Sequence, residues 1–274
     1  MIRLCFVIFI ITFSALSHST ICEGRWSVKV DNNSLFNKGD YTFVPVFVQL
    51  QPSVVKCKPQ GVYVRSEKVG SVILKSKESS FSGKILDSSG HTSGLNTTQG
   101  SVYSLSQGNR TKLLLSFPKV KRHPAGIYKG NLTFSLVGVE GIKVLNEVVM
   151  IKVPPYVNFG IMSDNNSAYI ADFGVLETGD TKKVELYFRS NTSVYLNFEP
   201  EYGHLKHSNY SDSRISYELF LDNRKVIFNE DFSLGAVNSF TSTQRKMTVK
   251  IGNTDNSRAG QYKERITITA TARP

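Results

Sequence analysis

The sequence predicts an all-β protein made of two immunoglobulin-like β-sandwich domains. Val, Ile, Phe, Tyr, Thr and Ser are abundant, and beyond the N-terminal segment no stretch has the apolar spacing that marks an amphipathic helix. One pattern, Ala-Gly-x-Tyr followed by alternating residues, occurs at residues 125–134 and again, 134 residues later, at residues 259–268. A repeat of so long a period indicates two copies of one domain rather than a solenoid.

The repeat extends upstream at the same offset, because the apolar run at residues 113–117 corresponds to residues 247–251. Each copy therefore predicts a strand, a polar turn and a second strand. In the second copy Ile266, Ile268 and Ala270 share one face, and mostly polar residues occupy the other. Alternation of this kind is typical of a strand with one buried face.

Residues 1–19 have the pattern of a secretory signal, with Arg3 before an apolar core at residues 4–13 and small residues near the expected cleavage site. The apolar run is too short for a good membrane span. A lipid-anchored Cys22 is the disfavoured alternative, since residues 19–21 lack the usual leucine and small residues. The sequence thus predicts an exported protein.

Three cysteines are present, and Cys5 would leave with the signal. In an exported chain the remaining two, Cys22 and Cys57, most simply form one disulfide. This bond would tie the start of the mature chain to the end of the second strand region.

The first half of the chain alternates apolar strand candidates with polar turns. Pro45 interrupts one of these strands and suggests an edge or a bulge. A polar loop at residues 87–100 contains His91 and Leu95, and a basic turn contains Lys119, Lys121, Arg122 and His123. Long polar loops are often functional. The strand candidates are residues 25–30, 41–50, 61–65, 71–75, 81–86, 112–117, 127–137 and 144–153.

Pro154 and Pro155 separate the two halves, so the expected domains are residues 20–154 and 155–274. In the first half another strand, residues 144–153, follows the repeated strand. In the second half no such strand follows, so the second domain is expected to lack its last strand. The second half's strand candidates are residues 156–162, 168–173, 181–190, 193–199, 214–221, 225–228, 245–251 and 261–271.

Charge is concentrated in the first half. Residues 20–154 contain 18 Lys and Arg against 8 Asp and Glu, whereas residues 155–274 contain 14 of each kind. This asymmetry favours an anionic partner near the first domain, such as a sulfated or sialylated glycan, a lipid headgroup, lipopolysaccharide or nucleic acid. The alternative is that the charge only maintains solubility.

No set of residues predicts catalysis, because the chain has neither a phosphate-binding loop nor a paired-carboxylate motif. His204 and His207 could form a metal site with Asp212 or Glu201, but surface histidines are the favoured interpretation. We therefore expect no enzyme activity, no cofactor and no metal.

The second half, over residues 160–274, resembles subunits of archaic chaperone–usher pili, the group that includes spore-coat-U-like secreted pilins. The resemblance rests on three stretches in one order: residues 172–180 leading into a strand, residues 215–222 after Leu205, and the terminal Ala-Gly-Gln-Tyr strand at residues 259–262. The second half departs from the family in having no cysteine pair.

The resemblance implies donor-strand complementation, in which a periplasmic chaperone and then a neighbouring pilin subunit supply the missing strand, with an outer-membrane usher as a further partner. Ile266, Ile268 and Ala270 would line the acceptor groove. Few residues precede Cys22 after signal cleavage, so the protein would accept a strand but donate none, as a subunit at the tip must.

The sequence therefore predicts a fimbrial tip adhesin on the cell surface, whose first domain binds a receptor. The receptor would be an anionic host glycan or surface and not nucleic acid, and the candidate binding residues are His91, Leu95, Lys119, Lys121, Arg122 and His123. A shaft or minor subunit, or a stand-alone secreted coat protein, is the main alternative. A secreted hydrolase and a eukaryotic glycoprotein with immunoglobulin-like domains are more distant ones; sequons such as residues 96–98, 131–133 and 191–193 leave the last open.

Overall fold

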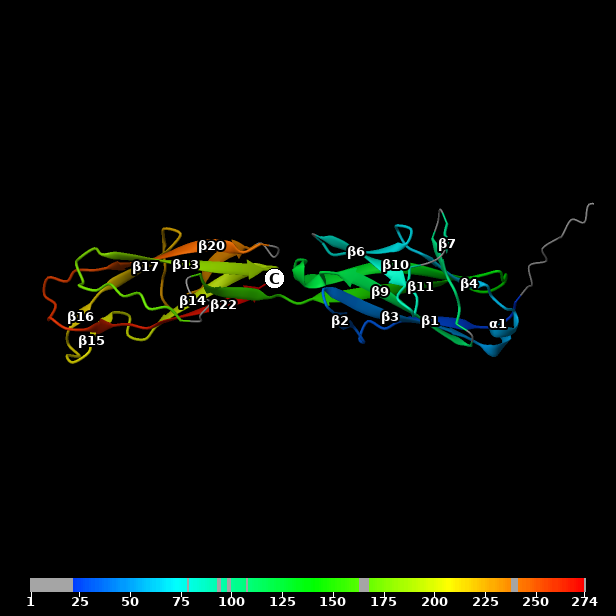
Figure 1. Cartoon of the computed structure of the whole chain (residues 1–274), viewed down its shortest axis with the longest axis horizontal. Coiled ribbons are helices and arrows are strands. Elements are labelled where there is room, and N and C mark those ends of the chain that lie inside the picture. The colour runs from blue at the N-terminus through cyan, green and yellow to red at the C-terminus, as the bar shows by residue number, and fades with distance from the viewer. Residues whose placement is uncertain are drawn as a thin grey trace, which may run out of the picture.

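The computed structural model describes residues 22–77, 79–92, 95–97, 100–106, 108–162, 168–237 and 241–273, so the expected signal at residues 1–19 lies outside it. Strands make up nearly all of the regular structure, which confirms the all-β prediction. Two β-structured bodies lie end to end along the long axis (Figure 1). No helix in the described ranges is both long and apolar enough to span a bilayer.

The first body contains one continuous antiparallel sheet with the order β1-β3-β9-β6-β5-β10-β4-β8-β7, in which β11 also pairs with β10 and β2 with β3. Its elements are β1 (Trp26–Val30), β2 (Phe36–Lys38), β3 (Tyr41–Leu50), α1 (Pro52–Lys56), β4 (Gly61–Arg65), β5 (Ser71–Lys75), β6 (Ser80–Leu86), β7 (Leu95–Asn96), β8 (Ser101–Tyr103), β9 (Arg110–Pro118), η1 (Val120–Arg122), β10 (Gly126–Val137) and β11 (Leu145–Val153).

The sheet wraps around one hydrophobic core that extends from Cys22 to Val153. The last strand, β11, lies between β10 and β1. It pairs with β10 over Gly126–Phe134, and Asn32, just after β1, joins it on the other side. The Asn32 amide donates to the Val148 carbonyl at 3.1 Å and accepts from the Met150 N–H at 2.9 Å. Val149, Ile151 and Val153 of β11 are at most 1% exposed, so this strand fills the core.

The second body contains three smaller antiparallel sheets, with orders β12-β13-β20-β17-β18, β19-β14-β22 and β16-β15-β21, and a separate core. Its strands are β12 (Val157–Ile161), β13 (Thr181–Ser190), β14 (Ser193–Pro200), β15 (Leu205–His207), β16 (Arg214–Ile215), β17 (Tyr217–Leu221), β18 (Arg224–Lys225), β19 (Phe232–Ala236), β20 (Thr243–Ile251), β21 (Tyr262–Lys263) and β22 (Ile266–Arg273).

The strand order of the first body recurs in the second. The series β1-β3-β9-β6 reappears as β12-β13-β20-β17, and β10-β4-β8 reappears as β22-β14-β19. The repeated sequences lie on equivalent strands, since β9 matches β20, and β10 matches β21 with β22. Strand β11 pairs with β10 in the first body, and no described strand pairs with β22 at the equivalent position in the second.

The repeated Ala-Gly-x-Tyr pattern forms a tyrosine corner in each body. The Tyr128 hydroxyl donates to the Pro124 carbonyl at 2.9 Å, and the Tyr262 hydroxyl donates to the Arg258 carbonyl at 2.8 Å. In both corners the glycine before the tyrosine has a positive φ, +154° and +148°, which only glycine adopts readily. The sequence repeat is therefore a repeated backbone corner at the start of equivalent strands.

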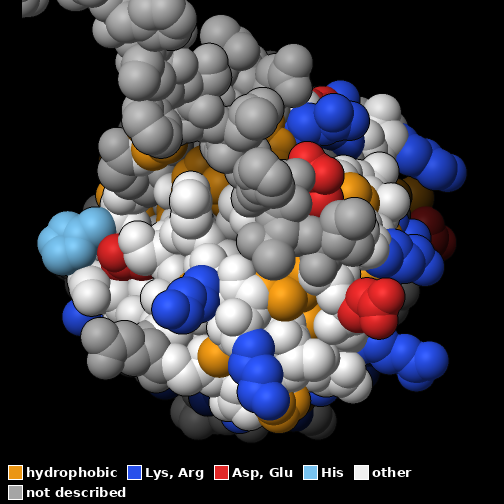
Figure 2. All heavy atoms as spheres, turned by 90° about the vertical axis from the view of Figure 1, so that its right-hand side faces the viewer, with side chains coloured by type: hydrophobic (Ala, Val, Ile, Leu, Met, Phe, Trp, Pro, Cys, Tyr) orange, Lys and Arg blue, Asp and Glu red, His pale blue; other side chains and the backbone are white. Residues whose placement is uncertain are grey.

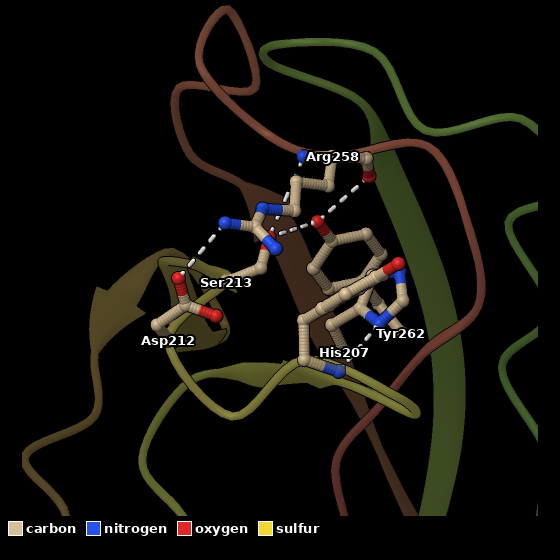
Figure 3. A network of polar contacts seen from close by, with 6 residues as sticks. His207, Asp212, Ser213, Arg258 and Tyr262 are labelled. Carbon is tan, nitrogen blue, oxygen red and sulfur yellow. Dashed lines mark hydrogen bonds and ion pairs between the residues drawn. The ribbon is translucent and has the colours of Figure 1, made fainter.

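The second corner is reinforced by its neighbours (Figure 3). The Ser213 and Tyr262 hydroxyls lie 2.6 Å apart, and Arg258 pairs with the Asp212 carboxylate at 3.1 Å. His207, 3% exposed, accepts the N–H groups of residues 209 and 210 at Nδ1, and its Nε2 faces the Ala259 carbonyl at 3.2 Å. This pattern places the proton on Nε2, so His207 has a structural role.

Two strand predictions in the second half are wrong. Residues 168–173 are mostly apolar, but they form no ladder with any described residue, and Ile170 is 86% exposed. Of residues 225–228 only Lys225 belongs to a strand. An apolar run alone does not supply the partner that a strand needs.

Other elements were missed. The short helix α1 starts at Pro52, and β19 contains Gly235 at φ +73° opposite a register shift in β14. Pro45 does not make β3 an edge strand, because β3 pairs with β9 along one side; only the pairing along its other side is interrupted near Pro45. Strand β3 lies inside the sheet, but β2 pairs with its residues 41–43 and β1 with residues 46–50, leaving Pro45 between the two ladders.

The junction between the bodies is organised by Asn191, which lies between β13 and β14 and is 5% exposed. Its side-chain amide donates to the carbonyls of His123 and Pro154, at 3.1 and 3.0 Å, and accepts the Tyr156 N–H at 3.0 Å. Its own carbonyl accepts the Ala125 N–H. Both amide atoms are occupied, so the sequon at Asn191 is closed to glycosylation in the folded chain.

Candidate functional site

The clearest candidate site is the seam between β12 and β22. Each strand ends a sheet: β12 pairs only with β13, and β22 only with β14, among the residues that the structure describes. The two strands lie close together. We call the edge-facing apolar residues of these two strands the open seam. They are Val157, Phe159 and Ile161 of β12, and Ile266, Ile268 and Ala270 of β22.

The open seam is less well covered than the rest of the core. All six of its residues pack against the second core but stay half-buried, whereas Leu196 and Phe198 on the neighbouring strand β14 are fully buried. The other face of β22 is fully polar up to its end, with Thr267, Thr269 and Thr271 exposed. The open seam therefore has the side chains of a core without the strand that would complete it.

The first body shows what such a seam looks like when it is closed. There the equivalent strands are β1 and β10, and β11 lies between them, with Val149, Ile151 and Val153 directed into the core. Because the two bodies share their strand order, the difference at this position identifies where a strand could be added to the second body.

Glu264 holds the start of β22 in place. Its carboxylate accepts the N–H groups of Glu201 at 3.0 Å, Tyr202 at 3.2 Å, His204 at 3.0 Å and Arg265 at 2.8 Å. This cap fixes the turn after β14 against the segment before β22. The start of β22, at one end of the open seam, is thus held by four backbone hydrogen bonds to one carboxylate.

The Cys22–Cys57 disulfide is confirmed, with a Cα–Cα distance of 6.0 Å. Cys22 is 2% exposed, and its N–H donates to the Glu140 carbonyl at 3.0 Å. The bond ties the first described residue to the end of α1.

The end of the first body remote from the junction carries α1 and the disulfide (Figure 1). Lys56 and Lys58, on either side of Cys57, are exposed there, and so is Lys143 in the turn before β11. Figure 2 looks onto this end and shows Lys and Arg side chains, together with Asp and Glu side chains, beside exposed apolar ones. Part of the positive charge of the first half therefore lies at this face.

His91 and Leu95 lie at the surface near the far end of β6. The side chain of His91 is 78% exposed, and its Nδ1 lies 3.9 Å from the Asp87 carboxylate. Hydrogen bonds from the N–H groups of residues 91 and 89 hold the pKa of Asp87 below its ordinary value. Leu95, in β7, is 60% exposed. Both side chains are accessible to a partner.

The basic turn lies at the opposite end of β6, beside the junction. Lys119 has a left-handed backbone at φ +51°, and Lys121 is exposed, whereas Arg122 and His123 are half-buried. The His123 ring stacks on Phe81 at 4.5 Å, and burial lowers its pKa. Phe81 is at the start of β6, and Leu86 at its end bridges to Thr92. The loop and the turn therefore do not form one site.

The sequence reasoning did not find the β12 half of the seam, the Glu264 cap or the Asn191 junction. Residues 157–161 do alternate, but nothing local identifies the strand that they would face. Within the described ranges no cluster of His, Cys, Asp or Glu could hold a metal ion.

No family model and no curated protein matches the sequence. Among solved structures, a chain of the CsuC–CsuE chaperone–tip adhesion subunit pre-assembly complex, from the archaic chaperone–usher Csu pili of Acinetobacter baumannii, is similar to this chain. It is 18% identical over 88% of this chain and 91% of that chain, with a TM-score of 0.42. CfaE, the adhesive subunit of CFA/I fimbria of enterotoxigenic Escherichia coli, is 12% identical over 83% and 73%, with a TM-score of 0.37. The CupB6 tip adhesin from Pseudomonas aeruginosa is 13% identical over 91% and 92%, with a TM-score of 0.34.

Proposed function

We propose that this protein is the tip adhesin of a chaperone–usher pilus. Its second domain joins the fibre by accepting a strand at the open seam, and its first domain binds a surface receptor. The observation that carries the proposal is the contrast between the two bodies: β11 closes the seam of the first, and no described strand closes the seam of the second.

An extended segment with alternating apolar residues is the occupant that fits the open seam. Its backbone would pair with the unpaired edges of β12 and β22, and its apolar side chains would cover Phe159, Ile266 and Ile268. Each aliphatic side chain that becomes buried contributes about 1.5–3 kcal/mol before the cost of ordering the segment. A periplasmic chaperone would supply such a strand first, and a neighbouring pilin subunit would replace it at the usher.

The tip position is supported by the sealed first body. Because β11 already fills the seam between β1 and β10, the first body needs no incoming strand at that position and would be available for receptor binding. Its basic end face and accessible residues suit an anionic glycan or surface. Receptor contacts by His91 and Leu95, or by Lys119, Lys121, Arg122 and His123, stay predictions, and they would form two sites. Export through the periplasm to the cell surface is part of the same proposal.

The test uses the full chain and a peptide with the sequence of β11, Leu145–Val153, as the probe. Because the peptide binds the folded second domain only, it should raise the temperature at which that domain unfolds; at 100 times its Kd the gain is about 2.7 kcal/mol. A control peptide with serine in place of Val149, Ile151 and Val153 should have no effect. Differential scanning calorimetry measures the unfolding temperature of the second domain with each peptide.

Matched variants locate the binding. Ile268→Asp places a charge in the open seam and should abolish the response to the peptide, whereas Thr269→Asp, on the exposed face of the same strand, should keep it.

The proposal fails if the peptide has no effect and the amide protons of β22 exchange as slowly as those of β14. A stand-alone coat protein would then be the better interpretation. A long free segment of alternating apolar residues before Cys22, found by sequencing the mature N-terminus, would instead indicate a shaft subunit.

A further inference from the structure

A hollow of about 600 Å³ lies on the outer face of the first body, over β3, β9, β6 and β5. None of its lining residues belongs to the open seam, to the polar loop or to the basic turn. Its size falls within the range of about 300–1,000 Å³ that small-molecule sites occupy. Among the lining residues are Tyr41, Phe43, Lys68, Ser71, Lys84 and Ser116.

The hollow is produced by one row of side chains across four neighbouring strands. The strand register places Phe43 opposite Ser116, Ser116 opposite Lys84, and Lys84 opposite Ser71. Residues in register across antiparallel strands point to the same face of the sheet. A small serine therefore lies between the ring of Phe43 and the ammonium group of Lys84, and this difference in size makes the depression.

One wall of the hollow is aromatic. Phe43 stacks on Phe36 with ring centroids 5.1 Å apart and planes at 13°, and Tyr41 lies 6.3 Å from Phe43. Tyr41 is 49% exposed and Phe36 is 41% exposed. Exposed aromatic rings held by stacking present a flat apolar surface, on which the C–H face of a sugar ring can pack.

The opposite side is cationic. Lys68 and Lys84 line the hollow, and neither forms an ion pair with any residue that the structure describes. Glu67, the acidic neighbour of Lys68, is paired with Lys75 at 2.6 Å. No described Asp or Glu lines the hollow. The site therefore offers positive charge that an anionic ligand could neutralise.

We propose that this hollow binds an acidic saccharide, a pyranose that carries a carboxylate or a sulfate. The sugar ring packs on Tyr41 and Phe43, its hydroxyls bond to Ser71 and Ser116, and its anionic group lies between Lys68 and Lys84. A neutral apolar ligand would form no ion pair with the two ammonium groups, and a bare anion would not pack on the aromatic rings. The inference rests on the proposed adhesin function and names its ligand class and site.

The experiment measures binding of two acidic probes, 3′-sialyllactose and a sulfated heparin disaccharide, to the full chain by calorimetry, with lactose as the neutral control. We expect at least one acidic probe to bind, with lactose at least tenfold weaker, and the affinity to fall as salt rises. Lys84→Ala and Tyr41→Ala should each raise the Kd at least tenfold. Ser82→Trp, from an exposed lining position on β6, should fill the hollow and abolish binding.

The matched control is Lys152→Ala, which removes an exposed lysine of β11 away from the hollow and should leave the Kd unchanged. The proposal is overturned if neither acidic probe binds, if Lys152→Ala weakens binding as much as Lys84→Ala, or if only vesicles of anionic phospholipid bind. Ile268→Asp should retain saccharide binding, because the open seam belongs to the other body. A failure of saccharide binding and a failure of strand acceptance can thus be distinguished.

Discussion

Gly126 and Gly260 hold equivalent positions in the two tyrosine corners, but their surroundings differ. Both have a φ near +150°, a region that residues with a Cβ avoid at a cost of about 1–3 kcal/mol. A Cβ at Gly126 would meet no atom within 4 Å. A Cβ at Gly260 would collide with the imidazole of His207, which is fixed by its own hydrogen bonds.

This difference gives a prediction at the residue scale. Gly126→Ala should destabilise the first domain by the backbone strain alone, about 1–3 kcal/mol. Gly260→Ala should destabilise the second domain by more, because His207 must also move. Denaturant unfolding of the full chain, followed for each domain, measures both losses. Equal losses in the two variants would contradict the proposed role of His207.

The repeated glycine and tyrosine could be identified from the sequence because a backbone corner depends on neighbouring residues. His207 and Ser213 were not identified as parts of that corner, since they lie about 50 residues upstream of Tyr262 and reach it only after the chain folds. For the same reason the spacing of His204 and His207 suggested a metal site only as the disfavoured alternative. The favoured interpretation, that both are surface histidines, is wrong for His207, which is 3% exposed.

Two elements complete the first domain: the strand β11 and the helix α1. Strand β11 fills the seam between β1 and β10, and the disulfide fixes the segment before β1 to α1. The disulfide encloses a sequence separation of 35 residues, for which the loop-closure model gives about 3–4 kcal/mol. The second domain contains no cysteine.

The prediction at the element scale concerns this bond. Replacing Cys22 and Cys57 together by serine should lower the unfolding free energy of the first domain by about 3–4 kcal/mol. The second domain, with its own core, should be unchanged and serves as the internal control. Differential scanning calorimetry, with and without a reductant on the unaltered chain, separates the two transitions. A loss shared by both domains would show that they unfold as one unit.

Most strands with strong alternation were predicted close to their observed bounds, including β3, β10, β13 and β14. The failures were segments in which pairing decides the outcome. Residues 168–173 are mostly apolar but have no partner strand among the described residues, whereas β19 contains Gly235 and still pairs with β14. Propensity measures how well a residue suits a pleated surface, and it cannot supply the neighbouring strand.

In the whole molecule, Asn191 joins the second domain to the linker and to the turn before β10. Its three side-chain hydrogen bonds and one backbone bond connect residues 123, 125, 154 and 156. The carboxyl end of β22 also lies at this junction, where the Thr192 hydroxyl donates to the Arg273 carbonyl at 2.7 Å. In the elongated arrangement of Figure 1, these polar contacts lie where the two bodies meet.

The prediction at this scale follows from those contacts. Asn191→Ala removes every side-chain bond and leaves the His123 and Pro154 carbonyls without that donor, so the junction should loosen. Small-angle X-ray scattering should show a broader distribution of distances and a smaller mean radius of gyration than the unaltered chain has. Asn158→Ala, an exposed position on β12, is the control and should scatter like the unaltered chain. An unchanged profile for Asn191→Ala would mean that the linker alone sets the arrangement.

The sequence by itself determined the β class, the repeated strand, turn and strand, the pairing of Cys22 with Cys57 and the face of the last strand that carries Ile266, Ile268 and Ala270. These features depend on composition, on local alternation or on a choice with few alternatives. Only the tertiary structure decided that β12 lies across the open seam from β22, and that Phe43, Ser116, Lys84 and Ser71 form one row. Both results depend on the order and register of strands far apart in the chain. Long-range pairing sets that order and register, and no local pattern in the sequence records it.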